Sequence, residues 1–158
     1  MRVSVGNPTA VRYCNTVNSS AMIDGKFEIM NKQIIRSVFT DILENPVMDE
    51  VLISKYFSTD YIQYVDGKTI NFDDFVKHIR VLKTKIRQIS ISIKSIAAEG
   101  DIVFTNHEVA TTMQDGQNGK MKVIAEFRLK DNKVYYCDEL THMIEGDNKD
   151  KDLGSRVD

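Results

Sequence analysis

The sequence predicts an α+β domain in which three N-terminal helices cover one face of a curved antiparallel sheet of four long strands plus a short one. Two observations support this fold class. Apolar residues recur with helical spacing over residues 31–86, and the spacing changes to strand-like alternation from Gln88 onward. Turn-forming segments then divide the second half of the chain into long strands. Helices followed by an antiparallel meander are typical of α+β folds.

The helices are predicted from their apolar stripes and from the residues at their ends. Pro46 ends the first helix, because proline disfavours a helical conformation at the residue before it. A second, short helix follows, and then a short strand with a turn at Asp66-Gly67. Asn71 is a favourable N-cap for the third helix, and Asp73 and Asp74 lie in its first turn, where the helix dipole favours negative charge.

Three parts of the chain are expected to differ in organisation. Residues 1–29 mix Gly, Pro, Asn, Ser and Thr without a sustained period, which favours a flexible N-terminal arm. Met30 directly precedes the first patterned segment and is an alternative start of the protein. Residues 30–145 form the predicted domain, and residues 146–158 are predicted to be a charged surface extension.

The composition argues against several classes of function. A net charge of −2 gives no long-range attraction for nucleic acid or an anionic membrane. No apolar run approaches the roughly 20 residues of a transmembrane helix. Cys14 and Cys137 give neither a disulfide framework nor a metal-ligand spacing, and no nucleotide-binding motif occurs. We therefore expect a cytoplasmic protein with no metal and no cofactor, which binds neither nucleic acid nor membrane.

The turn at Asp131-Asn132 selects which residues of the last strand face the helices. A two-residue turn there places Asp138 opposite Ala125, on the apolar face. A carboxylate on a covered apolar face is costly unless it is paired, hydrated or functional, so Asp138 is the predicted catalytic residue. The alternative is a structural role, in which Asp138 bonds to a tyrosine or a helix N-terminus. Tyr64 and Tyr136 are predicted pocket residues and hydrogen-bond donors in either case.

Further polar residues are predicted to line the same pocket from the neighbouring strands. If Glu99-Gly100 is a two-residue turn, Asn106 and Glu108 share the apolar face. Glu108 then lies about 10 Å from Asp138, across two strand spacings. One bulge in this strand would replace Glu108 by His107, and both residues stay candidates.

Other polar residues are assigned to the edges or the outside of the pocket. His142 shares the predicted face of the last strand and is expected at the pocket rim. Glu139 directly follows Asp138, and consecutive side chains of a strand face opposite sides. Glu139 is therefore expected on the outer face of the sheet. His78 is expected to be solvated on the third helix.

Three segments resemble the SnoaL-like branch of the nuclear transport factor 2-like superfamily, which includes proteins of the polyketide cyclase and ketosteroid isomerase type. They are YFSTDYIQYVDGKTINFDDFVKHIRVLK, IAAEGDIVFTNHEVATT and AEFRLKDNKVYYCDELTH, and the resemblance covers roughly residues 30–144. It implies a cystatin-like cone with a deep pocket, and a homodimer that forms through the outer sheet face. In enzymes of this group an acidic pocket residue moves a proton next to a carbonyl.

Two functions remain open at this stage. The first is acid–base chemistry of the isomerase, cyclase or hydrolase type on a small hydrophobic molecule, with Asp138 as the general base. The second is a non-catalytic dimeric module for ligand binding or protein interaction.

Overall fold

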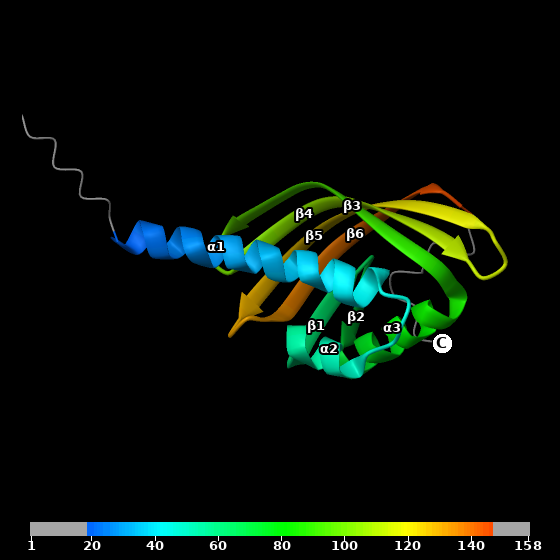
Figure 1. The fold of residues 1–158 in the computed structure, drawn as a ribbon, viewed down its shortest axis with the longest axis horizontal. Helices are drawn as coiled ribbons and strands as arrows, with labels where there is room; N and C mark the ends of the chain where they lie inside the picture. Colours follow the sequence, from blue (N-terminus) through cyan, green and yellow to red (C-terminus); the bar gives the residue numbers. More distant parts are fainter. Residues whose placement is uncertain (1–18, 147–158) are drawn as a thin grey trace, which may run out of the picture.

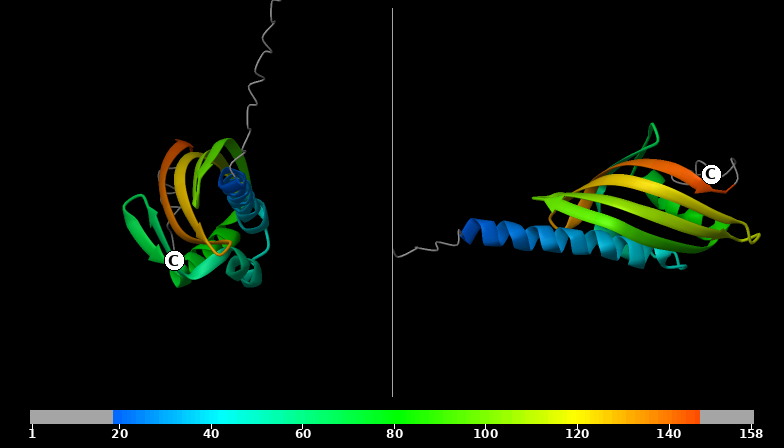
Figure 2. Two further views of the ribbon diagram at one scale, coloured as in Figure 1. Left: turned by 90° about the vertical axis from the view of Figure 1, so that its left-hand side faces the viewer. Right: turned by 90° about the horizontal axis from the view of Figure 1, so that it is seen from above.

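The structure is a computed structural model that describes residues 19–146, and it confirms the predicted α+β class. Its helical elements pack against one face of a curved sheet (Figures 1 and 2). In chain order the elements are α1 (Ser19–Val38), the π-helical segment η1 (Phe39–Glu44), α2 (Glu50–Tyr56), β1 (Phe57–Val65), β2 (Lys68–Asn71), α3 (Phe72–Lys85), β3 (Ile86–Glu99), β4 (Ile102–Met113), β5 (Asn118–Lys130) and β6 (Lys133–Glu145).

The sheet has six strands in the order β2-β1-β6-β5-β4-β3. β3 to β6 form the expected antiparallel meander, but β1 pairs with β6 in parallel, so the sheet is mixed. The predicted short strand is a hairpin of β1 and β2 that turns at Asp66 and Gly67, which both have positive φ angles. This hairpin extends the sheet beyond β6.

Helix α1 begins earlier than expected. Residues 19–29 were predicted to belong to a flexible arm, but they are helical from Ser19 onward. Two hydrogen bonds hold this part of the helix on the β3–β4 turn: Asn31 donates to the carbonyl of Gly100 at 3.0 Å, and Glu28 accepts from the Gly100 N–H at 3.2 Å. Residues 1–18 of the predicted arm, and residues 147–158 of the predicted extension, lie outside the described residues.

The predicted helix end at Pro46 is confirmed. Asn45 is extended, with φ −61° and ψ 123°. The Lys83 ammonium donates to the carbonyls of Leu43, at 2.6 Å, and of Asn45. These bonds satisfy carbonyl groups that the end of a helix leaves without partners. Burial lowers the pKa of Lys83 to about 8.

The hydrophobic core lies between the helices and the inner face of the sheet, the face that they cover. Helical segments contribute Ile35, Val38, Phe39 and Ile42, together with Phe75, Ile79 and Leu82 of α3. Within residues 19–146, no helix is long and apolar enough to cross a membrane.

A β-bulge in β6 overturns the predicted pairing of Asp138 with Ala125. Leu129 pairs with Val134, but the next pair is Arg128 with Tyr136, so Tyr135 is an extra residue. The pairs from Arg128 with Tyr136 to Met121 with Met143 are shifted by one position, and this shift reverses which side chains face the helices. Ala125 therefore pairs with Glu139, and the expected outer position of Glu139 was wrong.

A second bulge changes the phase of β4. The turn lies at Gly100 and Asp101, and Ser95 pairs with Asn106. The next pair is Ile93 with His107, which leaves Lys94 as the extra residue. His107 therefore replaces Glu108 on the inner face, as in the second alternative, but the bulge lies in β3 and not in the strand of residues 101–113, where it was expected.

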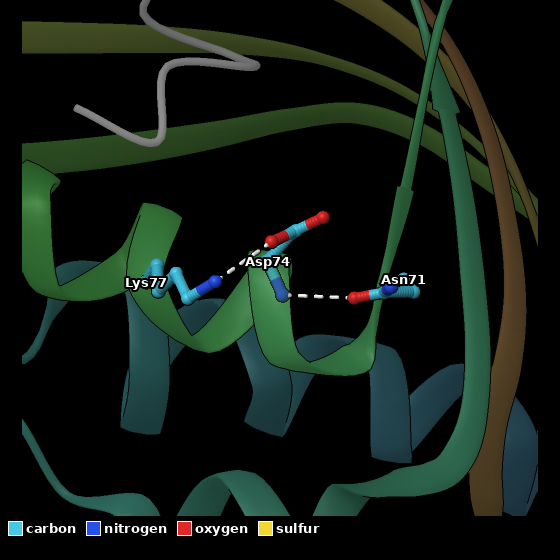
Figure 3. A network of polar contacts seen from close by, with 3 residues as sticks. All are labelled: Asn71, Asp74 and Lys77. Atoms are coloured by element: carbon cyan, nitrogen blue, oxygen red, sulfur yellow. Dashed lines mark hydrogen bonds and ion pairs between the residues drawn. The ribbon is translucent and has the colours of Figure 1, made fainter.

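The N-cap of α3 gives a test of these local interactions (Figure 3). The Asn71 side chain accepts from the backbone N–H of Asp74 at 3.0 Å. We expect Asn71→Ala to lower the free energy of unfolding by about 1 kcal/mol, because one N–H of the first turn loses its partner. Chemical denaturation measures the change.

Lys77→Ala is the control, since it removes an exposed ion pair with Asp74 (3.1 Å) on the same helix. This change should cost less than about 0.5 kcal/mol. An equal effect of the two substitutions would contradict the capping role of Asn71.

Candidate functional site

A largely apolar cavity of about 110 Å³ lies between the helices and the inner face of the sheet. Glu139 is the only carboxylate among its lining residues in the described part of the chain, and no lysine or arginine lines it there. The other polar lining residues include Gln63, His78, His107, Thr111 and Thr141. The apolar walls include Phe39, Phe57, Phe75, Ile79, Leu82, Ile86, Met121, Val123 and Phe127.

Glu139 is held by a chain of hydrogen bonds that extends from β1. The Tyr61 hydroxyl donates to Gln63 Oε1 at 3.2 Å, and Gln63 Nε2 donates to Glu139 Oε1 at 3.1 Å. The Cys137 thiol lies 3.8 Å from Glu139 Oε2 and completes the set of donors. Parallel pairing of Gln63 with Cys137 and of Val65 with Glu139 brings these strands together.

Burial raises the pKa of Glu139 to about 7, and the negative charge of Asp66 acts in the same direction. The hydrogen bonds from Gln63 and Cys137 oppose this shift only in part. Burial also raises the pKa of Cys137 and of Tyr61 above their usual values, so both stay neutral donors. Near neutral pH, Glu139 is therefore present both as a proton donor and as a proton acceptor.

Two histidines line the cavity from other elements. His107 is 3% exposed, its ring packs 4.7 Å from that of Phe39, and Nδ1 lies 3.0 Å from the Thr105 hydroxyl. Burial lowers the pKa of His107 to about 4, so the ring is neutral. His78 was expected to be solvated but is 4% exposed, because its spacing from Phe75 and Leu82 puts it on the buried stripe of α3.

Most of the predicted pocket residues lie on the outer face of the sheet instead. Asp138 is exposed and pairs with Glu126 and Tyr64, so its predicted position in the pocket was wrong. The bulge at Tyr135 explains why Tyr136, Asp138 and His142 face outward. The bulge at Lys94 explains the same for Asn106 and Glu108. Of the predicted site residues, His107 lines the cavity; those on the outer face are Tyr64, Asn106, Glu108, Tyr136, Asp138 and His142.

Three of the outer-face residues, Glu108, Tyr136 and Tyr64, contact charged or aromatic side chains on that face. Glu108 forms ion pairs with Lys120 at 3.0 Å and with Lys94 at 3.4 Å. The Arg128 guanidinium lies 4.5 Å from the ring centre of Tyr136, whose ring centre is 5.6 Å from that of Tyr64. Within residues 19–146, no group of three or more His, Cys, Asp or Glu side chains is arranged to hold a metal ion.

Comparisons with known proteins give one similar sequence and many similar folds. No protein-family profile matches the chain. An uncharacterized protein of Schizosaccharomyces pombe, C11D3.04c, is 35% identical over 100 residues, which cover 63% of this chain and 77% of the yeast protein.

Three solved structures illustrate the shared fold. AclR from Streptomyces galilaeus, a proposed hydroxylase, has a TM-score of 0.61 at 21% identity and covers 85% of each chain. A proposed SnoaL-like polyketide cyclase from Jannaschia sp. CCS1 has a TM-score of 0.62 at 13% identity, over 73% of this chain and 87% of that one. An epoxide hydrolase of M. tuberculosis has a TM-score of 0.60 at 13% identity, over 73% of this chain and 84% of that one.

The opposite pKa shifts of Glu139 and His107 predict opposite pH dependences of stability. Glu139 has a raised pKa, so its contribution is fully present below pH 4.5 and is lost as the pH rises through about 7. His107 has a lowered pKa, so its contribution is present above pH 6.5 and is lost as the pH falls through about 4. Each pKa shift corresponds to a change of about 3 kcal/mol in the contribution of that group to the free energy of unfolding.

Relative to the unmodified protein, Glu139→Gln should gain stability as the pH rises from 4.5 to 7. His107→Asn should lose relative stability as the pH rises from 4 to 6.5. Urea denaturation over this pH range measures both slopes. Parallel slopes for the two variants would contradict these pKa shifts.

Proposed function

We propose acid–base chemistry on a small uncharged ligand for this chain, which belongs to the same family as the yeast protein C11D3.04c and has the SnoaL-like, nuclear transport factor 2-like fold. The observation that carries the proposal is the position of Glu139 in an apolar cavity, with a pKa of about 7. A general acid–base residue works best when its pKa is close to the working pH. The proposed catalytic residue is thus Glu139, whereas the sequence had predicted Asp138.

The lining of the cavity favours an uncharged, largely apolar ligand. No lysine or arginine of the described residues lines it, so nothing there would pair with an anion. A ligand carbonyl next to Glu139 would accept a hydrogen bond from the protonated carboxyl group. The ionised form of Glu139 would remove a proton from the carbon next to that carbonyl and then return it. His107 is neutral, and in the tautomer whose Nδ1 accepts from the Thr105 hydroxyl its Nε2–H is a second donor.

The proteins with similar folds support this class of chemistry. They include an epoxide hydrolase and proposed polyketide cyclases. An acidic side chain in an apolar cavity fits reactions that move protons on small organic molecules. Fold likeness alone leaves the substrate open.

Acetophenone is a suitable probe, because it is small, uncharged and mostly apolar and has one carbonyl group. We expect it to bind more tightly below about pH 7 than above, since only the protonated Glu139 donates to the carbonyl. The protein should also catalyse exchange of its methyl protons with deuterium from the solvent. NMR measures both the binding and the exchange.

Glu139→Gln should remove the pH dependence of acetophenone binding and slow the exchange by about 100-fold or more. Asp138→Asn is the matched control, because it alters the neighbouring carboxylate on the other face of the same strand. This control should retain the exchange and the pH dependence, with at most a small downward shift of the midpoint, because the charge of Asp138 is the smallest cause of the raised pKa of Glu139. Equal losses in the two variants, or full exchange in Glu139→Gln, would rule out the proposed role.

We also propose that the chain forms a homodimer through the outer face of the sheet. This face exposes large apolar side chains at the centre of the sheet: Leu140 is 69% exposed and pairs with Ile124, which is 45% exposed. Phe104 and Tyr64 are also exposed on this face, in a row of cross-strand pairs in which Glu126 and Asp138 lie between them. Contiguous exposed apolar surface in the middle of a sheet is typical of an interaction site. A dimer without turnover corresponds to the alternative function of a binding module.

Leu140→Lys should convert the dimer to a monomer, because it places a charge in the middle of the proposed interface. Sedimentation equilibrium measures the mass. Val51→Lys on α2 is the control, because Val51 is 79% exposed but lies away from the sheet face. A monomeric unmodified protein, or equal masses for the two variants, would argue against this interface.

A further inference from the structure

We infer that the cavity recognises a hydroxyl or N–H group of its ligand through the side-chain oxygen of Thr141, two residues along β6 from Glu139. The inference rests on the proposed function and specifies the class of ligand. It comes from the way in which Asp66 holds β6 beside the cavity.

Asp66 joins the β1–β2 turn to two of the three cavity-lining residues of β6, Glu139 and Thr141. Its carboxylate accepts from the Thr141 backbone N–H at 2.8 Å and also from the Thr141 hydroxyl. Its own backbone N–H donates to the carbonyl of Glu139 at 3.3 Å. The residue has a positive φ of 49°, a conformation that Asp and Asn tolerate better than most residues. One turn residue therefore fixes both Glu139 and Thr141.

The contact with Asp66 limits what Thr141 can offer to a ligand. A hydroxyl group has one proton, and an ionised carboxylate accepts hydrogen bonds but donates none. The proton of the Thr141 hydroxyl is therefore committed to Asp66. The lone pairs of its oxygen remain, so Thr141 acts toward a ligand as an acceptor only.

The polar side chains of β1 near Glu139 bond to one another and to Glu139. Tyr61 donates to Gln63, and Gln63 donates to Glu139. Thr111 also lines the cavity, from β4, and its hydroxyl donates to the Gly119 carbonyl at a longer distance of 3.4 Å. Thr141 lies nearer to Glu139 along the chain, so a ligand bound at Glu139 would meet the oxygen of Thr141 first.

The spacing of Glu139 and Thr141 sets the distance between the polar groups of the ligand. Alternate residues of one strand face the same side, with Cα atoms roughly 7 Å apart. A ligand that satisfies both residues has a carbonyl or similar acceptor at one end and a hydroxyl or N–H at the other. An apolar body about the size of one six-membered ring separates them.

Ionisable groups reach this region from several elements. Asp66 belongs to the β1–β2 turn, Cys137 and Asp138 to β6, and Tyr61 to β1. His142 and Asp66 line a surface groove that shares Met121 and Thr141 with the cavity. The test therefore uses uncharged probes at a single pH, so that titration of these groups does not alter the comparison.

The test compares 4-hydroxyacetophenone with 4-methoxyacetophenone at about pH 6, where a phenol is neutral. The two molecules differ only in the donor proton and one methyl group at the far end of the ring. We expect the hydroxy compound to bind roughly ten-fold more tightly in an NMR titration. This ratio corresponds to the net free energy of about one hydrogen bond. The preference arises because a methoxy group leaves the Thr141 oxygen without a donor.

Four variants identify the oxygen responsible. Thr141→Val should abolish the preference, and Thr141→Ser should retain it. Thr111→Val is the matched control, because it removes the same group from another cavity-lining threonine, and it should leave the preference intact. Asp66→Asn should reduce the preference, because an amide can donate to Thr141 and so release its hydroxyl proton.

Equal binding of the two probes to the unmodified protein would overturn the inference, as would a preference that survives Thr141→Val. Unsubstituted acetophenone separates this failure from failure of the proposed function. If acetophenone binds in a pH- and Glu139-dependent way while the hydroxy preference is absent, the Thr141 inference alone fails. If none of the three probes binds, both the inference and the proposed function are wrong.

Discussion

The extra residue in β6, Tyr135, determines the chemistry of the interior. Because of this bulge, Cys137, Glu139 and Thr141 point toward the helices, and Asp138 points away from them. Without it, the opposite set of side chains would line the cavity. The raised pKa of Glu139, its hydrogen bonds to β1 and the exposed position of Leu140 all depend on this one shift in register.

The cavity contains ionisable side chains but favours their neutral forms. Burial removes water from both side chains and so favours their uncharged forms. It therefore raises the pKa of Glu139 and lowers that of His107. The Tyr61 and Gln63 side chains satisfy polar atoms that would otherwise be buried without partners. In such an environment a single proton on Glu139 changes the charge of the cavity, which is the basis for the proposed acid–base chemistry.

The sequence predicted the features that depend on local signals. The α+β class, the turn at Asp66-Gly67, the helix end at Pro46 and the N-cap at Asn71 are all present. Register was less predictable, because one inserted residue reverses the facing of a whole strand. Tyr135 and Tyr136 are equally suited to either face, so the alternation carried no sign of the bulge. The inward position of His78 could have been found, since it follows Phe75 by three residues.

The protonation of Glu139 is the central claim, and it can be measured directly. A titration of the Glu139 side-chain carboxyl carbon by ¹³C NMR, assigned by comparison with Glu139→Gln, reports this one group. We expect a midpoint near pH 7. A midpoint near 4.5, the ordinary value for glutamate, would show that the carboxylate is solvated and would contradict its proposed role as the acid–base group of a largely apolar cavity.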